Sequence, residues 1–344
     1  MINVLITGAG SVLGQSIFKA LAFSSYVSQL NVFFTNSEPY GAAFLFNSRD
    51  LYKLKVKKSY LVPLAKDSQY LSVIEKICDQ EHIDLIFCGT EHEIFKIAAL
   101  MTKAGYEKKI ASQPLNIVNI TTDKWETATF FQRHQIDAPS TTLYSHIKDW
   151  LPGRNSPFIM KPRISSASRN VHIINKPKDF ETYRFDTPEQ IIVQEMIGTI
   201  DDEYTIGCYV DRIDGSFHSI SMKRRLSKDG ASISGVVVND SEITAYCNEI
   251  IDALKKEGLV WGPINIQLRY RNKPLAFEIN GRFSSTEVVR AKFGFNAVEA
   301  AISNLVFNEP YKNFEPEYGS GFLRYYEELF YKKDDENFPI IIKP

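Results

Sequence analysis

The chain has 344 residues, of which 44% are hydrophobic and 24% charged, and its 40 basic and 41 acidic residues give a net charge of −1. This composition is typical of a globular protein of two or three domains, and the near-zero charge gives no electrostatic case for a nucleic-acid or membrane-surface partner. We find no run of 18 apolar residues and no secretory signal, so we expect a cytoplasmic protein. The cysteines lack CxxC pairing and disulfide-like spacing, which predicts buried, reduced thiols at Cys78, Cys88, Cys208 and Cys247.

Strand and helix patterns alternate along the first third of the sequence. Buried strands are predicted at 3–7, 31–36 and 83–88, a short edge strand at 60–63, and helices at 17–22, 70–81 and 94–98. Strands and helices at this spacing indicate a parallel, doubly wound α/β sheet. Ligands of such sheets bind beyond the carboxyl ends of the strands.

The pattern changes after residues 121–124, which begin a helix with a good N-terminal cap. Six short strand-like stretches follow, with the alternating polarity of antiparallel sheets: 158–161, 191–195, 203–210, 217–223, 261–270 and 275–280. Residues 299–306 are predicted to form a closing helix. We therefore place a domain boundary near residues 115–120 and expect an α/β domain followed by an α+β region.

A glycine-rich turn, Gly8-x-Gly10-x-x-x-Gly14, lies between the first strand and the first helix. This is the context of a dinucleotide-binding fingerprint, although the spacing departs from GxGxxG by one residue. A tight structural turn or a substrate anion at the helix N-terminus explains these glycines, and an NAD(P)-dependent oxidoreductase is the alternative. Tyr144 and Lys148 form a YxxxK pair, but they do not lie in a long helix, so we assign them no dehydrogenase role.

The most informative segment is a predicted hairpin at residues 262–285. Gln267 lies on its first strand, and Glu278 and Asn280 lie on its second strand, where residues two apart share a face. One carboxylate and two amide oxygens suit Mg²⁺, which takes few protein ligands and completes its shell with phosphate oxygens and water. Arg282 follows on the same face, where it is suited to hold a transferring phosphoryl group. An exposed polar strand face is the simpler alternative.

This hairpin resembles the metal-binding part of ATP-grasp enzymes, in the stretches NIQLR (265–269) and LAFEINGRFSSTEVVRAKFGFNAVEAA (275–301). Within that superfamily it is most similar to the synthetase modules of the carbamoyl-phosphate synthase large chain and to standalone relatives such as the pyrrolysine-biosynthesis ligase. Upstream segments resemble the family's ATP-binding elements in the same order. The resemblance implies a set of ATP-binding residues: Lys124 and Lys161 at the phosphates, Ser165, Ser166 and Ser168 in the phosphate-covering loop, Glu195, Met196 and Ile197 at the adenine, and Glu203 at the ribose.

Two features depart from the family pattern. The loop at 163–170 (RISSASRN) has serine, alanine and asparagine where relatives usually have glycines, so an ATP-binding module without turnover is a further alternative. Gly281 stands where the carbamoyl-phosphate synthetase modules usually have proline, which weakens the link to bicarbonate chemistry.

The resemblance implies a Rossmann-like parallel-sheet domain at 1–117 and a two-lobed ATP-grasp fold, with a small lobe at 118–196, a large lobe at 197–325 and a tail at 326–344. It also implies an ATP- and Mg²⁺-dependent ligase, with Mn²⁺ as an alternative metal, that joins a carboxylate to an amine or ammonia. ATP would phosphorylate the carboxylate, the amine would displace phosphate, and ADP and phosphate would be released. Gln267, Glu278 and Asn280 are the expected metal ligands, Asn280 and Arg282 are the expected catalytic residues, and we expect no catalytic cysteine or histidine.

The expected partners are small molecules, namely a carboxylate and an amine or ammonia donor, with no nucleic acid and no membrane; a homodimer is left open. We expect the substrate at the strand ends of the N-terminal sheet, together with an arginine from the basic run at 223–225. The candidate substrate residues are Gly10, Ser11, Glu38, Thr90, Glu91 and Arg225. Glu38 and Glu91 would suit an amino group on that substrate. Binding of ATP rather than NADH would separate the ligase from the oxidoreductase.

Overall fold

The computed structural model describes residues 1–39, 41, 54, 56–155, 157–165, 170–199, 202–227, 230–328 and 330. Its N-terminal sheet has five parallel strands: β1 (Ile2–Ile6), β2 (Leu30–Asn36), β3 (Val56–Leu61), β4 (Leu85–Phe87) and β5 (Ile110–Ala111). Their spatial order is β3-β2-β1-β4-β5. The connections contain α1 (Val12–Leu21), η1 (Val27–Gln29), α2 (Tyr70–Gln80), α3 (Glu91–Ala99) and η5 (Leu100–Thr102). The predicted parallel α/β sheet, with an edge strand near residue 60, is confirmed.

A second, antiparallel sheet follows in the chain. It contains β6 (Thr141–Leu143), β7 (Phe158–Pro162), β8 (His172–Ile174) and β9 (Ile191–Glu195), in the spatial order β6-β9-β7-β8. Four short helices accompany it: η6 (Tyr144–His146), α6 (Ile147–Trp150), η7 (Pro177–Thr182) and η8 (Pro188–Gln190). Its buried side chains, such as Phe158, Met160 and Val193, form a small core of their own.

The third sheet is also antiparallel and has the spatial order β14-β13-β10-β11-β12-β15. Its strands are β10 (Glu203–Val210), β11 (Phe217–Leu226), β12 (Ser232–Val238), β13 (Gly262–Arg271), β14 (Lys273–Asn280) and β15 (Gly321–Leu323). One face shares a core with α4 (Leu115–Thr122), α5 (Lys124–Arg133) and α7 (Ser241–Glu257). The other face shares a core with α8 (Glu287–Lys292), α9 (Ala297–Ile302), the π-helix η9 (Ser303–Phe307) and the N-terminal domain.

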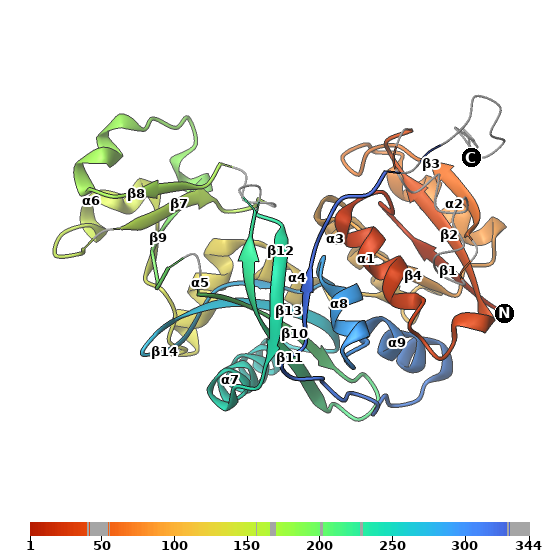
Figure 1. The fold of residues 1–344 in the computed structure, drawn as a ribbon. Helices are drawn as coiled ribbons and strands as arrows, with labels where there is room; N and C mark the ends of the chain where they lie inside the picture. Colours follow the sequence, from red (N-terminus) through yellow and green to blue (C-terminus); the bar gives the residue numbers. More distant parts are fainter. Residues whose placement is uncertain are drawn as a thin grey trace.

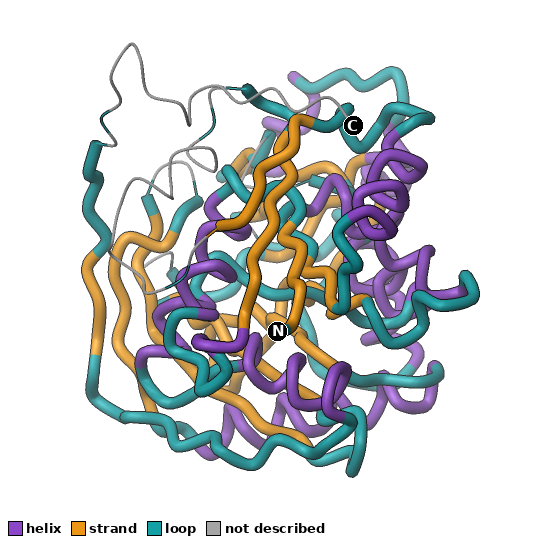
Figure 2. Tube along the Cα trace, turned by 90° about the vertical axis from the view of Figure 1, so that its right-hand side faces the viewer, coloured by secondary structure: helices purple, strands orange, loops and turns teal. Residues whose placement is uncertain are grey.

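Figure 1 shows the four-stranded sheet and the parallel sheet at opposite ends of the molecule, with the six-stranded sheet between them. The strands of the different sheets are also seen in the rotated view of Figure 2. Helix α1 packs against α8 and α9, so the N-terminal domain and the six-stranded sheet are joined by one continuous core. Among the described residues, no helix is both long and apolar enough to cross a membrane.

Several elements were not expected from the sequence, among them α4, α7, β12 and β15. The helix expected from residue 121 begins at Lys124, after Asp123 caps it by accepting a hydrogen bond from the N–H of Trp125 (2.9 Å). Helices α4 and α5 both pack on the six-stranded sheet. All four cysteines lie in the described part of the chain, buried and with free thiols.

The glycine-rich turn is a point of close backbone packing. Gly8 has a φ of 51°, in the left-handed region that favours glycine. A Cβ on Gly14 would lie 2.6 Å from the carbonyl oxygen of Gly8, and a Cβ on Gly89 would lie 2.0 Å from that of Thr7. Both distances are shorter than real Cβ contacts, so positions 14 and 89 accept only glycine without a shift of the backbone. The interpretation of this turn as a structural turn therefore accounts for the glycines without a dinucleotide.

We expect Gly89→Ala to lower the free energy of unfolding by about 3 kcal/mol, because the new Cβ meets backbone that cannot move away cheaply. A matched control is Gly215→Ala, where φ is 72° and nothing lies within 4 Å of the new atom. That control should lose only about 1 kcal/mol, from left-handed strain. Urea unfolding followed by circular dichroism measures both, and equal losses in the two variants would contradict the packing argument.

Candidate functional site

The hairpin of β13 and β14 brings the predicted metal ligands to one face. Gln267 pairs with Glu278, and Asn265 pairs with Asn280. The amide nitrogens of Gln267 and Asn280 both donate to Glu278 Oε1, at 3.4 Å and 3.0 Å. A bulge follows Gln267, which places Phe277 as an extra residue on β14. The side chains of Gln267, Glu278 and Asn280 therefore lie on one face of the hairpin, as strand alternation predicts.

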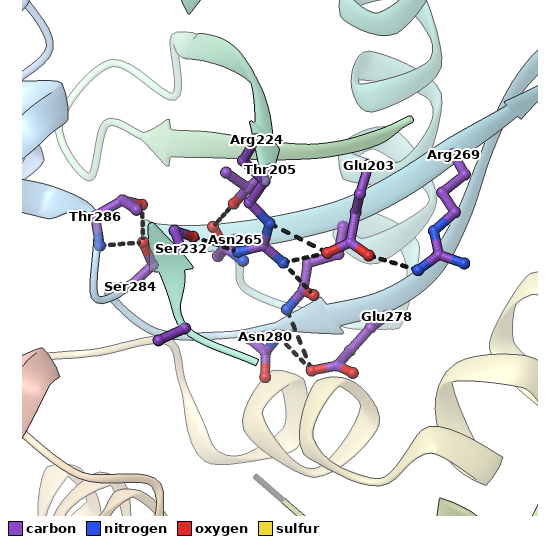
Figure 3. A network of polar contacts seen from close by, with 12 residues as sticks. Glu203, Thr205, Arg224, Ser232, Asn265, Arg269, Glu278, Asn280, Ser284 and Thr286 are labelled. Atoms are coloured by element: carbon purple, nitrogen blue, oxygen red, sulfur yellow. Dashed lines mark hydrogen bonds and ion pairs between the residues drawn. The ribbon is translucent and has the colours of Figure 1, made fainter. Parts of the chain in front are cut away.

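Two arginines surround a buried carboxylate beside this face (Figure 3). Glu203 on β10 is only 2% exposed, and its two oxygens accept from Arg224 (2.6 Å) and Arg269 (2.7 Å). Arg224 Nη2 also donates to Gln267 Oε1 (2.8 Å), and Arg224 Nη1 donates to Ser232 Oγ (3.1 Å). Glu203 therefore serves here as the anion between two arginines, with both oxygens already accepting hydrogen bonds.

Two lysines approach the same site from the four-stranded sheet and from α5. Lys161 on β7 donates to Gln194 Oε1 (3.1 Å) and lies over the ring of Phe277, 5.5 Å from its centroid. Lys124 donates to the carbonyl oxygen of Ser165 (2.9 Å). Both lysines are more than nine-tenths buried. Burial lowers the pKa of Lys161 to about 8, although the negative charge of Glu278 acts in the opposite direction.

The charges around Glu278 keep it ionised. Burial by itself would raise its pKa, but the positive charges of Lys124 and Lys161, together with the hydrogen bond from Asn280, hold the pKa below its usual value. The site thus combines an ionised carboxylate with two lysines, a balance that suits a cation bound to polyphosphate.

Arg282 joins the hairpin to the N-terminal domain. Its guanidinium forms an ion pair with Glu91, in the first turn of α3, and donates to Asn280 Oδ1 (3.2 Å) and to the carbonyl oxygen of Phe283 (2.9 Å). Burial lowers the pKa of Arg282 to about 10, so it stays charged at neutral pH. Arg282, expected beside the metal, and Glu91, expected at the substrate, thus lie in direct contact.

Three further substrate candidates lie near the carboxyl ends of β1 and β4. Ser11 caps α1 and donates to the carbonyl oxygen of Gly89 (2.5 Å). Thr90 donates to Glu93 (2.9 Å), and Gly10 packs on the side chain of Asn36. These residues therefore share one edge of the parallel sheet with Glu91.

The structure does not bring every candidate to the site. Glu38 is exposed just after β2, the neighbour of β1, and so lies at the same edge of the sheet, whereas Arg225 is exposed on the face of β11 opposite to Arg224. Arg224, not Arg225, is the arginine of the basic run that joins the cluster.

The expected adenine-binding residues lie at the end of β9 and just after it. Glu195 forms an ion pair with Arg271 at the tip of the hairpin (2.8 Å), and Arg271 also donates to the carbonyl oxygen of Met196 (3.4 Å). Ile197 is buried. In the loop that is expected to cover the phosphates, Ser165 is described, whereas Ser166 and Ser168 lie outside the described residues.

Sequence reasoning missed several charged residues that the structure brings together. Arg290 is 1% exposed and donates to Asn265 (2.6 Å), Thr205 (3.1 Å) and Glu287 (2.9 Å). Gly207 makes room for it, because a Cβ there would lie 2.7 Å from the arginine side chain. Strand alternation could have indicated Asn265 and Arg269, because they lie on the same face of the strand as the metal candidate Gln267.

The donor set fits a hard divalent cation, although the site is not a cage of charged ligands. Among the described residues, no three His, Cys, Asp or Glu side chains gather where they could hold a metal. A cation here would depend on the ionised Glu278. The amide oxygens of Gln267 and Asn280 accept from Arg224 (2.8 Å) and Arg282 (3.2 Å) in this structure, and they would have to turn toward Glu278 to join it as ligands. Mg²⁺ accepts such sparse protein ligation when phosphate oxygens and water complete its shell.

A family model described as an ATP-grasp domain matches residues 121–286, from the last turn of α4 to just beyond the hairpin. The chain has the fold of the ATP-grasp superfamily, as the resemblance predicted. A segment of 104 residues is 26% identical to the uncharacterised MG011 homolog of Mycoplasma pneumoniae. This segment spans 30% of the present chain and about a third (35%) of that relative.

Solved structures share the fold over nearly the whole chain. The L-amino acid ligase of Bacillus licheniformis is 17% identical, with a TM-score of 0.67 and coverage of 92% of this chain and 78% of that one. The N5-carboxyaminoimidazole ribonucleotide synthetase of Thermus thermophilus is 15% identical, with a TM-score of 0.70 and coverage of 93% and 82%. The biotin carboxylase domain of the Hydrogenobacter thermophilus 2-oxoglutarate carboxylase, in complex with MgADP, ADP and bicarbonate, is 10% identical, with a TM-score of 0.69 and coverage of 93% and 73%.

Proposed function

We propose that this protein is an ATP- and Mg²⁺-dependent ligase that activates a carboxylate as an acyl phosphate and joins it to an amine or ammonia. The observation that carries the proposal is the facing arrangement of Glu278, with its two amide neighbours, and the buried lysines Lys124 and Lys161. The ligase, synthetase and carboxylase names of the structural neighbours agree with it. ATP consumption and free thiols suit the cytoplasm.

In this proposal each lobe contributes one part of the ATP site. Lys124 and Lys161 bind phosphate oxygens, residues 195–197 bind the adenine, and the loop at 163–170 covers the phosphates. Glu203 holds Arg224 and Arg269 in place, and its expected role at the ribose belongs to the same proposal. The resemblance to carbamoyl-phosphate synthase modules and the expected boundaries at 117, 196 and 325 belong to the same proposal.

The proposed chemistry needs no protein nucleophile. Mg²⁺, or Mn²⁺, held by Glu278 and Asn280 with Gln267, would neutralise charge on the phosphate oxygens. The lysines and Arg282 hold the phosphoryl group by charge and position, which is how phosphoryl transfer is mostly catalysed. Arg282 also lies toward the N-terminal sheet through its pairing with Glu91.

The acid substrate is proposed to bind between Arg282 and the carboxyl edge of the parallel sheet, the usual ligand position in such sheets. Gly10, Ser11, Thr90 and Glu91 lie at that edge. Glu91 would accept an amino group once a substrate carboxylate takes its place on Arg282.

We expect the reaction to release ADP and phosphate rather than AMP and pyrophosphate, because the charged groups favour transfer of the terminal phosphoryl group. A malachite-green phosphate screen over pairs of carboxylates and amines would find the substrates, and chromatography would identify the nucleotide product. Hydroxylamine should then trap the acyl phosphate as a hydroxamate. AMP as the stoichiometric product would overturn the mechanism even though the fold stands.

A further inference from the structure

We propose that Asp123 and Arg163 are positioning residues of the ATP site, which hold its two buried lysines at a fixed distance from each other. The inference rests on the proposed function, because it concerns how those lysines bind phosphate. Asp123 directly precedes Lys124, and Arg163 follows Lys161 by two residues. The ion pair between Asp123 and Arg163, here called the clamp, therefore connects the two lysines through very short stretches of backbone.

The two lysines come from elements that pack in different cores. Lys124 is the first residue of α5, whose Phe130 and Phe131 lie in the core beneath the six-stranded sheet. Lys161 lies on β7 of the four-stranded sheet, which has a core of its own around Phe158 (Figure 1). The separation of the lysines is therefore set by the contacts between these elements, and the clamp is one such contact.

The clamp is a shielded, two-pronged ion pair. Arg163 Nε donates to both oxygens of Asp123, at 3.1 Å each, and Arg163 Nη2 donates to Asp123 Oδ2 at 2.7 Å. Nη2 also lies 3.4 Å from the carboxylate of Glu126, which is half exposed. The side chains of Arg163 and Asp123 are only 19% and 13% exposed. A pair of this kind fixes geometry better than an exposed, single-contact ion pair does.

Each partner of the clamp is also fixed to its own element. Asp123 caps α5 by accepting from the N–H of Trp125 (2.9 Å). The backbone N–H of Arg163 donates to the carbonyl oxygen of Gln190 (2.9 Å), just before β9, and the N–H of Lys124 donates to the carbonyl oxygen of Arg163 (3.0 Å). Neither side chain can shift without disturbing the start of α5 or the end of β7.

The charges of the two lysines meet at one point of the site. Burial raises the pKa of Glu278, but the positive charges of Lys124 and Lys161 outweigh it. Burial lowers the pKa of Lys161, and the charge of Lys124 lowers it further. Two ammonium groups this close repel each other, so a constraint is needed to keep both in place for a polyphosphate. The clamp supplies that constraint.

Two simpler interpretations make different predictions. If the pair only stabilises the fold, its loss lowers the melting temperature and leaves the nucleotide affinities of the folded protein unchanged. If Arg163 attracts phosphate by its charge alone, Arg163→Gln weakens ATP binding, whereas Asp123→Asn removes a negative charge and tightens it. The clamp predicts weaker ATP binding in both variants, although their charge changes have opposite signs.

Calorimetry with ATP and with adenosine, both in EDTA, tests the clamp. We expect Arg163→Gln to weaken ATP binding about tenfold, within the range of coupling between neighbouring residues, while the affinity for adenosine changes less than about twofold. Arg133→Gln is the matched control, because it also removes an arginine of α5 that pairs with a carboxylate, that of Glu257 (2.8 Å), but at the opposite end of the helix. This control should change neither affinity.

Asp123→Asn provides the decisive sign. Asparagine is as good an N-cap as aspartate, so α5 keeps its cap while the ion pair is lost. This variant should weaken ATP binding and leave adenosine binding unchanged. Unchanged or tighter ATP binding in Asp123→Asn, or an equal loss for adenosine in Arg163→Gln, would overturn the inference. Should Arg163→Gln not fold, Arg163→Lys keeps the charge but cannot bind both carboxylate oxygens, and it should show the same loss for ATP alone.

A double-mutant cycle then locates the effect. In a Lys124→Ala background, Arg163→Gln should cost ATP binding nothing further, because a single remaining lysine has no partner to be held against. Fully additive losses would contradict the clamp. A wild-type protein that binds neither ATP nor adenosine would overturn the proposed function itself, whereas a wild type that binds ATP and an Arg163 variant that behaves like the Arg133 control would overturn only the inference.

Discussion

Glu278→Gln is expected to reduce Mg²⁺-dependent ATP turnover at least about 100-fold while leaving the fold intact. The ionised carboxylate is the one formal negative charge of the proposed ligand set, and the substitution removes it without changing the shape of the side chain. The hydrogen bonds from Gln267 and Asn280 have a carbonyl oxygen as acceptor in place of the carboxylate. Phosphate release, measured with the substrates that the screen identifies, reports the loss.

For ATP binding without metal, Glu278→Gln is expected to have the opposite effect. Without metal, Glu278 places a negative charge near the phosphates, so Glu278→Gln should bind ATP in EDTA at least as tightly as the wild type. Glu249→Gln, at an exposed position of α7, serves as the charge-matched control and should change neither quantity. Near-wild-type turnover of the Glu278 variant would remove the metal assignment.

The second large effect concerns Lys161. Lys161→Ala should weaken ATP binding about 10- to 100-fold at pH 7, the range expected for one charge-assisted hydrogen bond to phosphate. Since the pKa of this lysine is lowered to about 8, it is protonated below that pH and neutral above it. The affinity of the wild type for ATP should therefore fall as the pH rises through about 8.

Calorimetry between pH 7 and about 9.5 checks this profile, because the last phosphate proton of ATP leaves near pH 6 and does not interfere. Lys161→Arg is the matched control, since arginine keeps its charge over the whole range. The arginine variant should bind ATP at pH 7 but show no step near pH 8. A step that persists in both variants would mean that another group controls the pH dependence.

The parallel sheet could be predicted from the sequence because its signals are local. The buried strand at 31–36 centres on the apolar residues 32–34, and segments of helical period separate it from the neighbouring strands in the sequence. The shared face of Gln267, Glu278 and Asn280 was likewise predictable, because strand alternation and a hairpin fix it within a short stretch of chain.

Other elements carried a local signal that was not used. Helix α7 begins at Ser241, and Asp240 caps it by accepting hydrogen bonds from the N–H groups of Glu242 (3.0 Å) and Ile243 (3.1 Å), an ordinary N-cap pattern. Strand β15 had no such signal, because three residues are too few to show a period.

The sequence by itself determined the alternation of strands and helices in the parallel sheet, the shared face of the hairpin at residues 262–285 and the family that its motifs resemble. Only the tertiary structure decided that Glu91 contacts Arg282, that Arg224 rather than Arg225 joins the site, and that Glu203 lies between two arginines. The physical reason is the range of the interactions. Periodicity and turn chemistry act between near neighbours in the chain, whereas the partner of a buried charge depends on how whole sheets and helices pack.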